Sequence, residues 1–186
     1  MASAQNPESL RAYLRAGTRA DHDNTEAVLA PFDVTTANGL AGFLTAHLLA
    51  IEAVEAALGG MDWPKGLPSL PPASEMILAD LAALGHARPA IRLDPVAASD
   101  PVGPVYVLAG SRMGNRVIRK HVARNGTPET NESLTYIKAQ SLDLHGQKVL
   151  NALDQLRVAD RPACLAGARA TFVTFAAAAQ AAAHIV

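Results

Sequence analysis

A histidine followed one helical turn later by a carboxylate lies near the start of the chain, at His22 and Glu26. On a helix, residues three or four apart share a face, and this places Arg15 and Arg19 on the same stripe. A carboxylate that holds one ring nitrogen leaves the other nitrogen neutral and directed at a metal ion. The arginines add positive charge about 5–10 Å along that face, within reach of acidic groups on a bound ligand. The alternative interpretation is a solvated surface histidine.

Two glycines four residues apart, Gly110 and Gly114, interrupt a segment rich in valine, leucine and isoleucine. Each glycine inside a helix costs on the order of 1 kcal/mol relative to alanine, so the pair predicts a compensating gain. The two positions share one helix face and remove its side chains, which lets a flat partner approach closely. That partner is either the backbone of another helix or a planar ligand, and the spacing leaves both open.

The elements that must position these residues are all predicted to be helices, because apolar residues recur at helical spacing and no useful period-2 alternation occurs. The first helix is predicted to begin at Asn6, with Pro7 in its first turn, and to continue until Pro31. Further helices are predicted over residues 36–58, 74–84, 100–126, from 127, over 141–158 and from 160 onward. No repeat or linker divides the sequence, so residues 1–186 are predicted to form one all-α domain.

Composition excludes several classes of protein. The formal net charge is −1, from 16 basic and 17 acidic residues, so no overall field favours nucleic acid or an anionic membrane. A single cysteine, Cys164, rules out an intramolecular disulfide, and its apolar neighbours suggest a buried, inert thiol. The N-terminus lacks the apolar run of a signal peptide, and the alanine-rich stretch over 163–186 is expected to be a core-packed helix. A cytoplasmic protein without a membrane partner is therefore expected.

Together the two stretches resemble a known family. The pattern L-[RK]-x-x-T-[RK]-x-x-H-x-x-x-E spans residues 14–26, and a G-x-x-x-G pair and a basic run follow at 110–120. This order is similar to that of the haem oxygenases, and Y-V-L-x-G-S-x-x-G over 106–114 most resembles the bacterial forms associated with bacteriophytochromes. The resemblance covers most of the chain and implies the multi-helical haem oxygenase-like fold.

The resemblance implies a role for each matching residue. His22 would be the proximal iron ligand with Glu26 as its partner, Thr18 would lie beside the proximal face, and Arg15 and Arg19 would contact the haem propionates. On the distal helix, the residues implied at the haem are Gly110, Ser111, Gly114, Asn115 and Arg116. The implied reaction cleaves haem b with dioxygen to biliverdin, carbon monoxide and ferrous iron. Electrons would come from a ferredoxin- or flavin-type reductase, and a bacteriophytochrome could accept the biliverdin.

Two positions depart from the commonest family pattern. Ser111 stands where many haem oxygenases have an aspartate, and Asn115 stands where a second glycine is frequent. Both substitutions bear on turnover rather than on haem binding, so a non-catalytic haem carrier or sensor with the same fold is a second interpretation. A phosphotransfer protein that uses an exposed histidine is a third, and His47 would be its residue. The apolar face around His47 instead favours a hydrogen-bonded core histidine.

Overall fold

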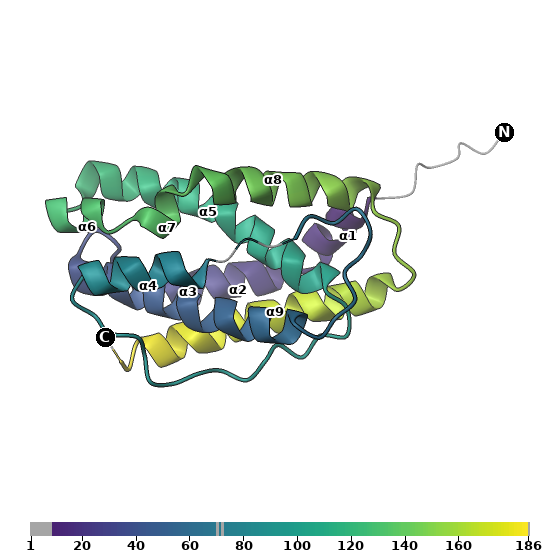
Figure 1. Ribbon diagram of the computed structural model, residues 1–186, viewed down its shortest axis with the longest axis horizontal. Coiled ribbons are helices and arrows are strands. Elements are labelled where there is room, and N and C mark those ends of the chain that lie inside the picture. The colour runs from purple at the N-terminus through teal and green to yellow at the C-terminus, as the bar shows by residue number, and fades with distance from the viewer. Residues whose placement is uncertain (1–8, 70, 72, 186) are drawn as a thin grey trace.

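The computed structural model describes residues 9–69, 71 and 73–185, and in these ranges the chain forms helices and loops without strands. Figure 1 shows α8 along one side of the molecule, α3, α4 and α9 along the other, and α5 crossing from α8 to α9. The helices are α1 (Leu10–Gly17), α2 (Arg19–Leu29), α3 (Ala37–Leu58), α4 (Ser74–Ala83), α5 (Val102–Asn125), α6 (Pro128–Glu132), α7 (Thr135–Lys138), α8 (Gln140–Gln155) and α9 (Arg161–Ala182). The all-α prediction is confirmed.

The N-terminal segment forms two helices where the sequence predicted one. The predicted start at Asn6 lies outside the described residues, and α1 begins after Ser9, whose hydroxyl accepts a hydrogen bond from the Ala12 amide at 3.2 Å. The helix breaks at Thr18, directly after Gly17. The Gly17 carbonyl accepts a hydrogen bond from Arg169 of α9 at 2.9 Å, so a contact from a distant helix satisfies it. The single-helix prediction was wrong because this contact is invisible in the local sequence.

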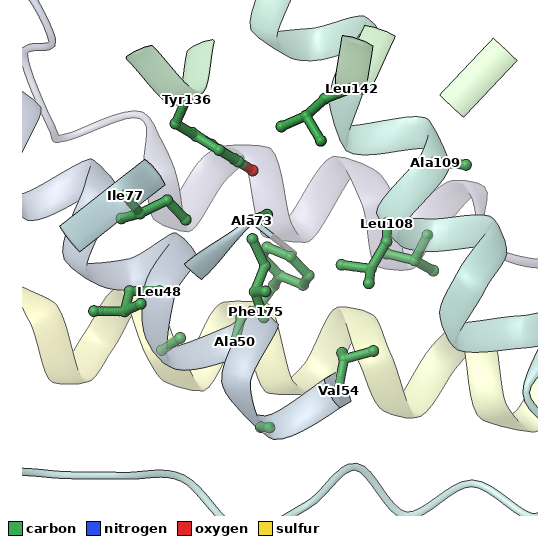
Figure 2. Packing of buried hydrophobic residues seen from close by; sticks show 14 of the residues in the cluster. Leu48, Ala50, Val54, Ala73, Ile77, Leu108, Ala109, Tyr136, Leu142 and Phe175 are labelled. Carbon is green, nitrogen blue, oxygen red and sulfur yellow. The ribbon is translucent and has the colours of Figure 1, made fainter. Parts of the chain in front are cut away.

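Helices α3 and α9 form the centre of the core. α3 is buried along most of its length, and it packs extensively against α9 and α4. Figure 2 shows Leu48 and Val54 of α3 in one cluster with Phe175 of α9 and Leu108 of α5. Burial of apolar surface at about 25 cal/mol per Å² makes this cluster the main source of stability. One continuous core thus involves all the long helices.

Helices α3 and α9 are also long and apolar enough to pass a composition test for a membrane span. Most of the apolar stretch of α3 is buried inside the protein, whereas 39% of that of α9 is buried, where the helix packs against α1, α2, α3 and α5. A core helix satisfies the same length and composition test as a membrane helix. The contacts of α9 agree with the core-packed helix predicted for this stretch.

Short helices replace the longer fifth helix that was expected from residue 127. Thr127 begins α6 by accepting a hydrogen bond from the Thr130 amide at 3.2 Å. A second start follows at α7, because buried Asp80 of α4 accepts hydrogen bonds from the amides of Thr135 at 2.8 Å and Tyr136 at 2.9 Å. A carboxylate at a helix N-terminus satisfies amides that have no partner inside the helix.

Candidate functional site

His22 lies on the outer face of α2 with 52% of its side chain exposed. Its Nδ1 atom is 3.8 Å from a carboxylate oxygen of Glu26, so the predicted one-turn pair is present. Asp23 lies nearer, at 3.5 Å, although the sequence analysis gave it no role. On its other side, the imidazole meets the ring of Phe172 of α9 edge-on, with centroids 5.9 Å apart. The ring is therefore held from two sides.

This arrangement leaves one nitrogen of His22 free to bind a metal. With both carboxylates beside Nδ1, the proton is favoured on that atom and Nε2 is left as the metal-binding nitrogen. The three side chains also bring their ligand atoms within 4.8 Å of one another, which is close enough for a free cation. All three are exposed, and exposed clusters of this kind are common on protein surfaces. The histidine alone therefore does not define the ligand.

The predicted arginines lie at an open groove of about 450 Å³ along α1 and the start of α2. Arg19 Nε donates to both carboxylate oxygens of Asp23, each at 3.1 Å, and this contact lowers the Asp23 pKa. Arg11 pairs with Asp154 at 3.3 Å. Arg15 lines the same groove and makes no ion pair with the residues that the structure describes. Arg15 is thus the arginine of this groove best placed for an acidic group of a ligand.

The α5 face that carries Gly110 and Gly114 is open. A Cβ atom built on either glycine would meet no atom within 4 Å, so neither glycine makes room for another helix. Met113 and Val117 flank the pair at helical spacing and are 46% and 69% exposed. The sequence analysis did not single out these two, although their spacing from Gly110 would have placed them beside it. A bare strip with exposed apolar borders suits a flat apolar ligand.

Three other predicted residues do not lie free on this face. Ser111 donates its hydroxyl hydrogen bond to the Leu108 carbonyl at 2.8 Å, within its own helix. Asn115 is buried, and its Oδ1 atom has no partner among the described residues. Arg116 forms an ion pair with buried Asp143 of α8 at 3.3 Å. Arg116 therefore links α5 to α8 through this ion pair, a contact that the local sequence does not predict.

Thr18 lies inside the protein rather than on the surface of α2. It is buried at the junction of α1 and α2, and its hydroxyl donates to the Leu14 carbonyl at 2.8 Å. This hydrogen bond satisfies the side chain inside the protein. Thr18 therefore forms part of the break between α1 and α2. The break sets the direction of α2, and with it the position of His22.

The remaining titratable candidates are core residues. His47 is buried, its Nδ1 lies 3.0 Å from the Phe43 carbonyl, and burial lowers its pKa to about 4. The prediction that His47 is a hydrogen-bonded core residue is confirmed. Because His47 is buried, it is not the exposed histidine that a phosphotransfer protein would need. Burial raises the pKa of the Cys164 thiol to about 12, in agreement with the expected inert cysteine.

Helix α9 connects the two candidate faces. Both α2 and α5 pack extensively against α9, α5 packs also against α8, and α2 and α5 do not pack extensively against each other. Thr25 of α2 donates to the Phe172 carbonyl at 3.3 Å, and Gly103 seats the start of α5 on α9. Thr25 is the buried residue of α2, and the helix packs mainly on α9. Two helices held on a common third helix can flank a ligand without touching each other.

Comparisons with known proteins identify the fold. No family model and no curated protein sequence matches the chain. Its structure, however, has the all-helical haem oxygenase fold. It is similar to the haem oxygenase of Neisseria meningitidis, which was solved with nitric oxide and carbon monoxide bound. The TM-score is 0.73 over 94% of this chain and 92% of that one, at 20% sequence identity.

Proposed function

We propose that this protein is a haem oxygenase that binds haem b between α2 and α5 and cleaves it to biliverdin, carbon monoxide and ferrous iron. The observation that carries the proposal is the open glycine face of α5 in a chain with the haem oxygenase fold. Helix packing would have explained Gly110 and Gly114 without any ligand, and their open surroundings remove that explanation.

The residues present fit a haem group. His22 Nε2 would bind the iron, while Asp23 and Glu26 hold Nδ1 and so fix the orientation of the ring. Arg15 would pair with a propionate, as the arginine of the α1 groove with no ion pair among the described residues. Arg19, tied to Asp23, would act mainly through the position of that carboxylate.

The distal face would be formed by backbone rather than side chains. Gly110 and Gly114 would let α5 approach the macrocycle closely, and exposed Met113 and Val117 would pack on its apolar edge. When bound, haem supplies both the iron that reacts with dioxygen and the ring that is oxidised. Asn115 and Arg116 are left out of this set because the first is buried and the second is paired with α8.

The hydroxyl of Ser111 is the polar side chain next to Gly110, and its proton is directed to the Leu108 carbonyl. Its lone pairs are free to accept a hydrogen bond from water at the glycine face. The engagement of Ser111 with its own helix is also what favours the second candidate function, a haem carrier that does not turn over its ligand.

The proposal extends to partners and place of action. The electrons would come from an external ferredoxin- or flavin-type reductase, and the biliverdin would be available to a bacteriophytochrome. The protein would act in the cytoplasm. These points rest on the resemblance of the Y-V-L-x-G-S-x-x-G segment to the forms associated with bacteriophytochromes.

A hemin titration tests the binding proposal. The apo-protein should develop a sharp Soret band that saturates at one equivalent, and His22→Ala should lose or shift it. His86→Ala, in the loop after α4, is the matched control and should behave as wild type. Equal, weak binding by wild type and His22→Ala would reject the haem proposal. Reductant added under air then separates enzyme from carrier, because an oxygenase loses the Soret band and releases biliverdin, whereas a carrier keeps its spectrum.

A further inference from the structure

A small cavity lies behind the glycine face, on the buried side of α5. It has a volume of about 20 Å³ and lies where α3, α5 and α8 meet. Successive residues on a helix are about 100° apart, so Arg112, two residues after Gly110, points away from the open face. The residues that matter most at the cavity wall are three polar ones, Glu55, Arg112 and His145, and three apolar ones, Ile51, Leu108 and Leu142.

Polar atoms without protein partners gather at this place. Arg112 is only 7% exposed, and its Nη1 atom is buried without a hydrogen bond to any described residue. The Nε2 atom of His145 is buried in the same condition. An unpaired buried donor costs about 1–3 kcal/mol, and more when it is charged. Two such atoms at one cavity indicate a common partner.

The hydroxyl of Tyr136 adds a third atom of this kind. The Arg112 guanidinium lies over the Tyr136 ring, 4.7 Å from its centroid, so the two side chains share one site. Figure 2 shows the hydroxyl end of Tyr136 directed toward Ala73, Leu108 and Leu142, which belong to the cavity wall.

The charge of Arg112 has a counter-charge across the cavity. Glu55 lines the same space from α3, but its carboxylate and the guanidinium form no direct ion pair in the described structure. Burial and the neighbouring charge of Glu52 raise the pKa of Glu55, and this rise is opposed by the Ala73 backbone, the Ser74 hydroxyl and, last, the positive charge of Arg112. A water molecule can bridge two charged groups that face one cavity without direct contact.

We propose that this cavity binds one ordered water molecule that bridges Arg112, Glu55 and His145. The volume exceeds the 10–15 Å³ or so that one water requires, and the three partners meet the two to four hydrogen bonds that buried waters make. The water would provide hydrogen-bond partners for the Arg112 guanidinium and the His145 imidazole nitrogen, and it would link the Glu55 carboxylate to Arg112. The site belongs to the apo-protein, so it stands or falls independently of haem binding.

Oxygen-17 relaxation dispersion of water on the full-length apo-protein tests the site directly. Wild type should hold one more long-lived internal water than the double variant Arg112→Met/Glu55→Leu, in which apolar side chains fill the cavity. Arg124→Met, an exposed position on the same helix, is the control and should match wild type. Equal dispersion amplitudes in wild type and the double variant would overturn the proposal. A crystal structure of wild type with that cavity dry would do the same if the double variant fails to fold.

A double-mutant cycle tests the partnership of the two charges. Glu55→Gln should raise the equilibrium constant for unfolding by roughly tenfold in wild type and by much less in an Arg112→Met background. Glu52→Gln, one turn earlier on α3, is the matched control, because its partners Arg88 and Arg92 lie at the surface. Its effect should be the same in both backgrounds. Equal effects of Glu55→Gln in the two backgrounds would exclude Glu55 as the counter-charge.

Discussion

Two regions of the protein use the same residue types for opposite purposes. In the sealed region, where α5 starts on α9, a Cβ atom on Gly103 would lie 2.1 Å from the Cys164 carbonyl oxygen. In the open region, Gly110 and Gly114 of the same helix meet nothing within 4 Å. The sealed glycine permits two helices to touch, whereas the open pair leaves a bare surface. A glycine inside a helix thus signals close approach, and only the structure shows whether a helix is the approaching partner.

The histidines divide in the same way. His47 lies in the sealed core, hydrogen-bonded to the Phe43 carbonyl and packed on aromatic rings. His22 lies in the open region, half-exposed, with carboxylates beside one nitrogen only. Core histidines are held neutral by burial, while an exposed histidine with an oriented ring is available to a ligand. Four substitutions test this division.

Gly103→Ala should have the largest effect. The added methyl group would overlap backbone atoms of Cys164 and Ala168, which cannot move without separating α5 from α9. Overpacking of this kind costs about 3 kcal/mol or more of unfolding free energy, which urea denaturation of the apo-protein would measure. A stability within 0.5 kcal/mol or so of wild type would show that the interface is not sealed.

The pH dependence of stability should reveal His47. Its pKa is lowered from 6.5 to about 4 in the folded state, so the unfolded chain takes up a proton first as pH falls. The contribution of His47 is therefore fully present above pH 6.5 or so and is lost between there and about pH 4, with a total of about 3 kcal/mol. His47→Leu should lose less stability than wild type over this interval. Parallel profiles of the two proteins would contradict a buried neutral histidine.

Gly114→Leu should separate binding from folding. The leucine has open space in the apo-protein, so unfolding should change little, but it would occupy the face proposed for haem. Hemin affinity should fall by about tenfold or more, since one misplaced side chain at a packed contact costs 1–3 kcal/mol or so. Arg124→Leu, exposed on the same helix, should leave both quantities unchanged. Unaltered hemin affinity in Gly114→Leu would place the ligand elsewhere.

Gly110→Ala should give the smallest effect and the opposite sign to Gly103→Ala. With no neighbour to displace, the methyl group adds only helix propensity, and apo stability should rise by about 0.5–1 kcal/mol. In urea denaturation, the midpoint of Gly103→Ala should move to a lower urea concentration than that of wild type, and the midpoint of Gly110→Ala should move to a higher one. If Gly103→Ala and Gly110→Ala both lost stability, the difference between the sealed and the open region would be contradicted.

Part of this picture is readable in the sequence because it is local. The His22–Glu26 pair depends on helical spacing alone, and so does the shared face of Gly110 and Gly114. The difference between Gly103 and the other two glycines depends on Cys164 and Ala168, about sixty positions later. Tertiary neighbours that distant leave no mark in the pattern around a residue.

The errors of the sequence analysis have the same origin. The break at Thr18 accompanies a hydrogen bond from Arg169 to Gly17, and the second start at α7 depends on Asp80. In both cases a long-range polar contact set the helix boundary, whereas the periodic apolar pattern predicted only that these segments are helical.

Proton NMR of the ferric hemin complex tests most directly whether haem lies between His22 and the open face of α5. Nuclei close to the paramagnetic iron acquire large shifts, so the His22 ring protons and the α-protons of Gly110 and Gly114 should move far from their positions in the apo-protein. The α-protons of Gly103, sealed against α9, should move much less. A complex in which His22, Gly110 and Gly114 keep their apo-protein shifts would contradict the account.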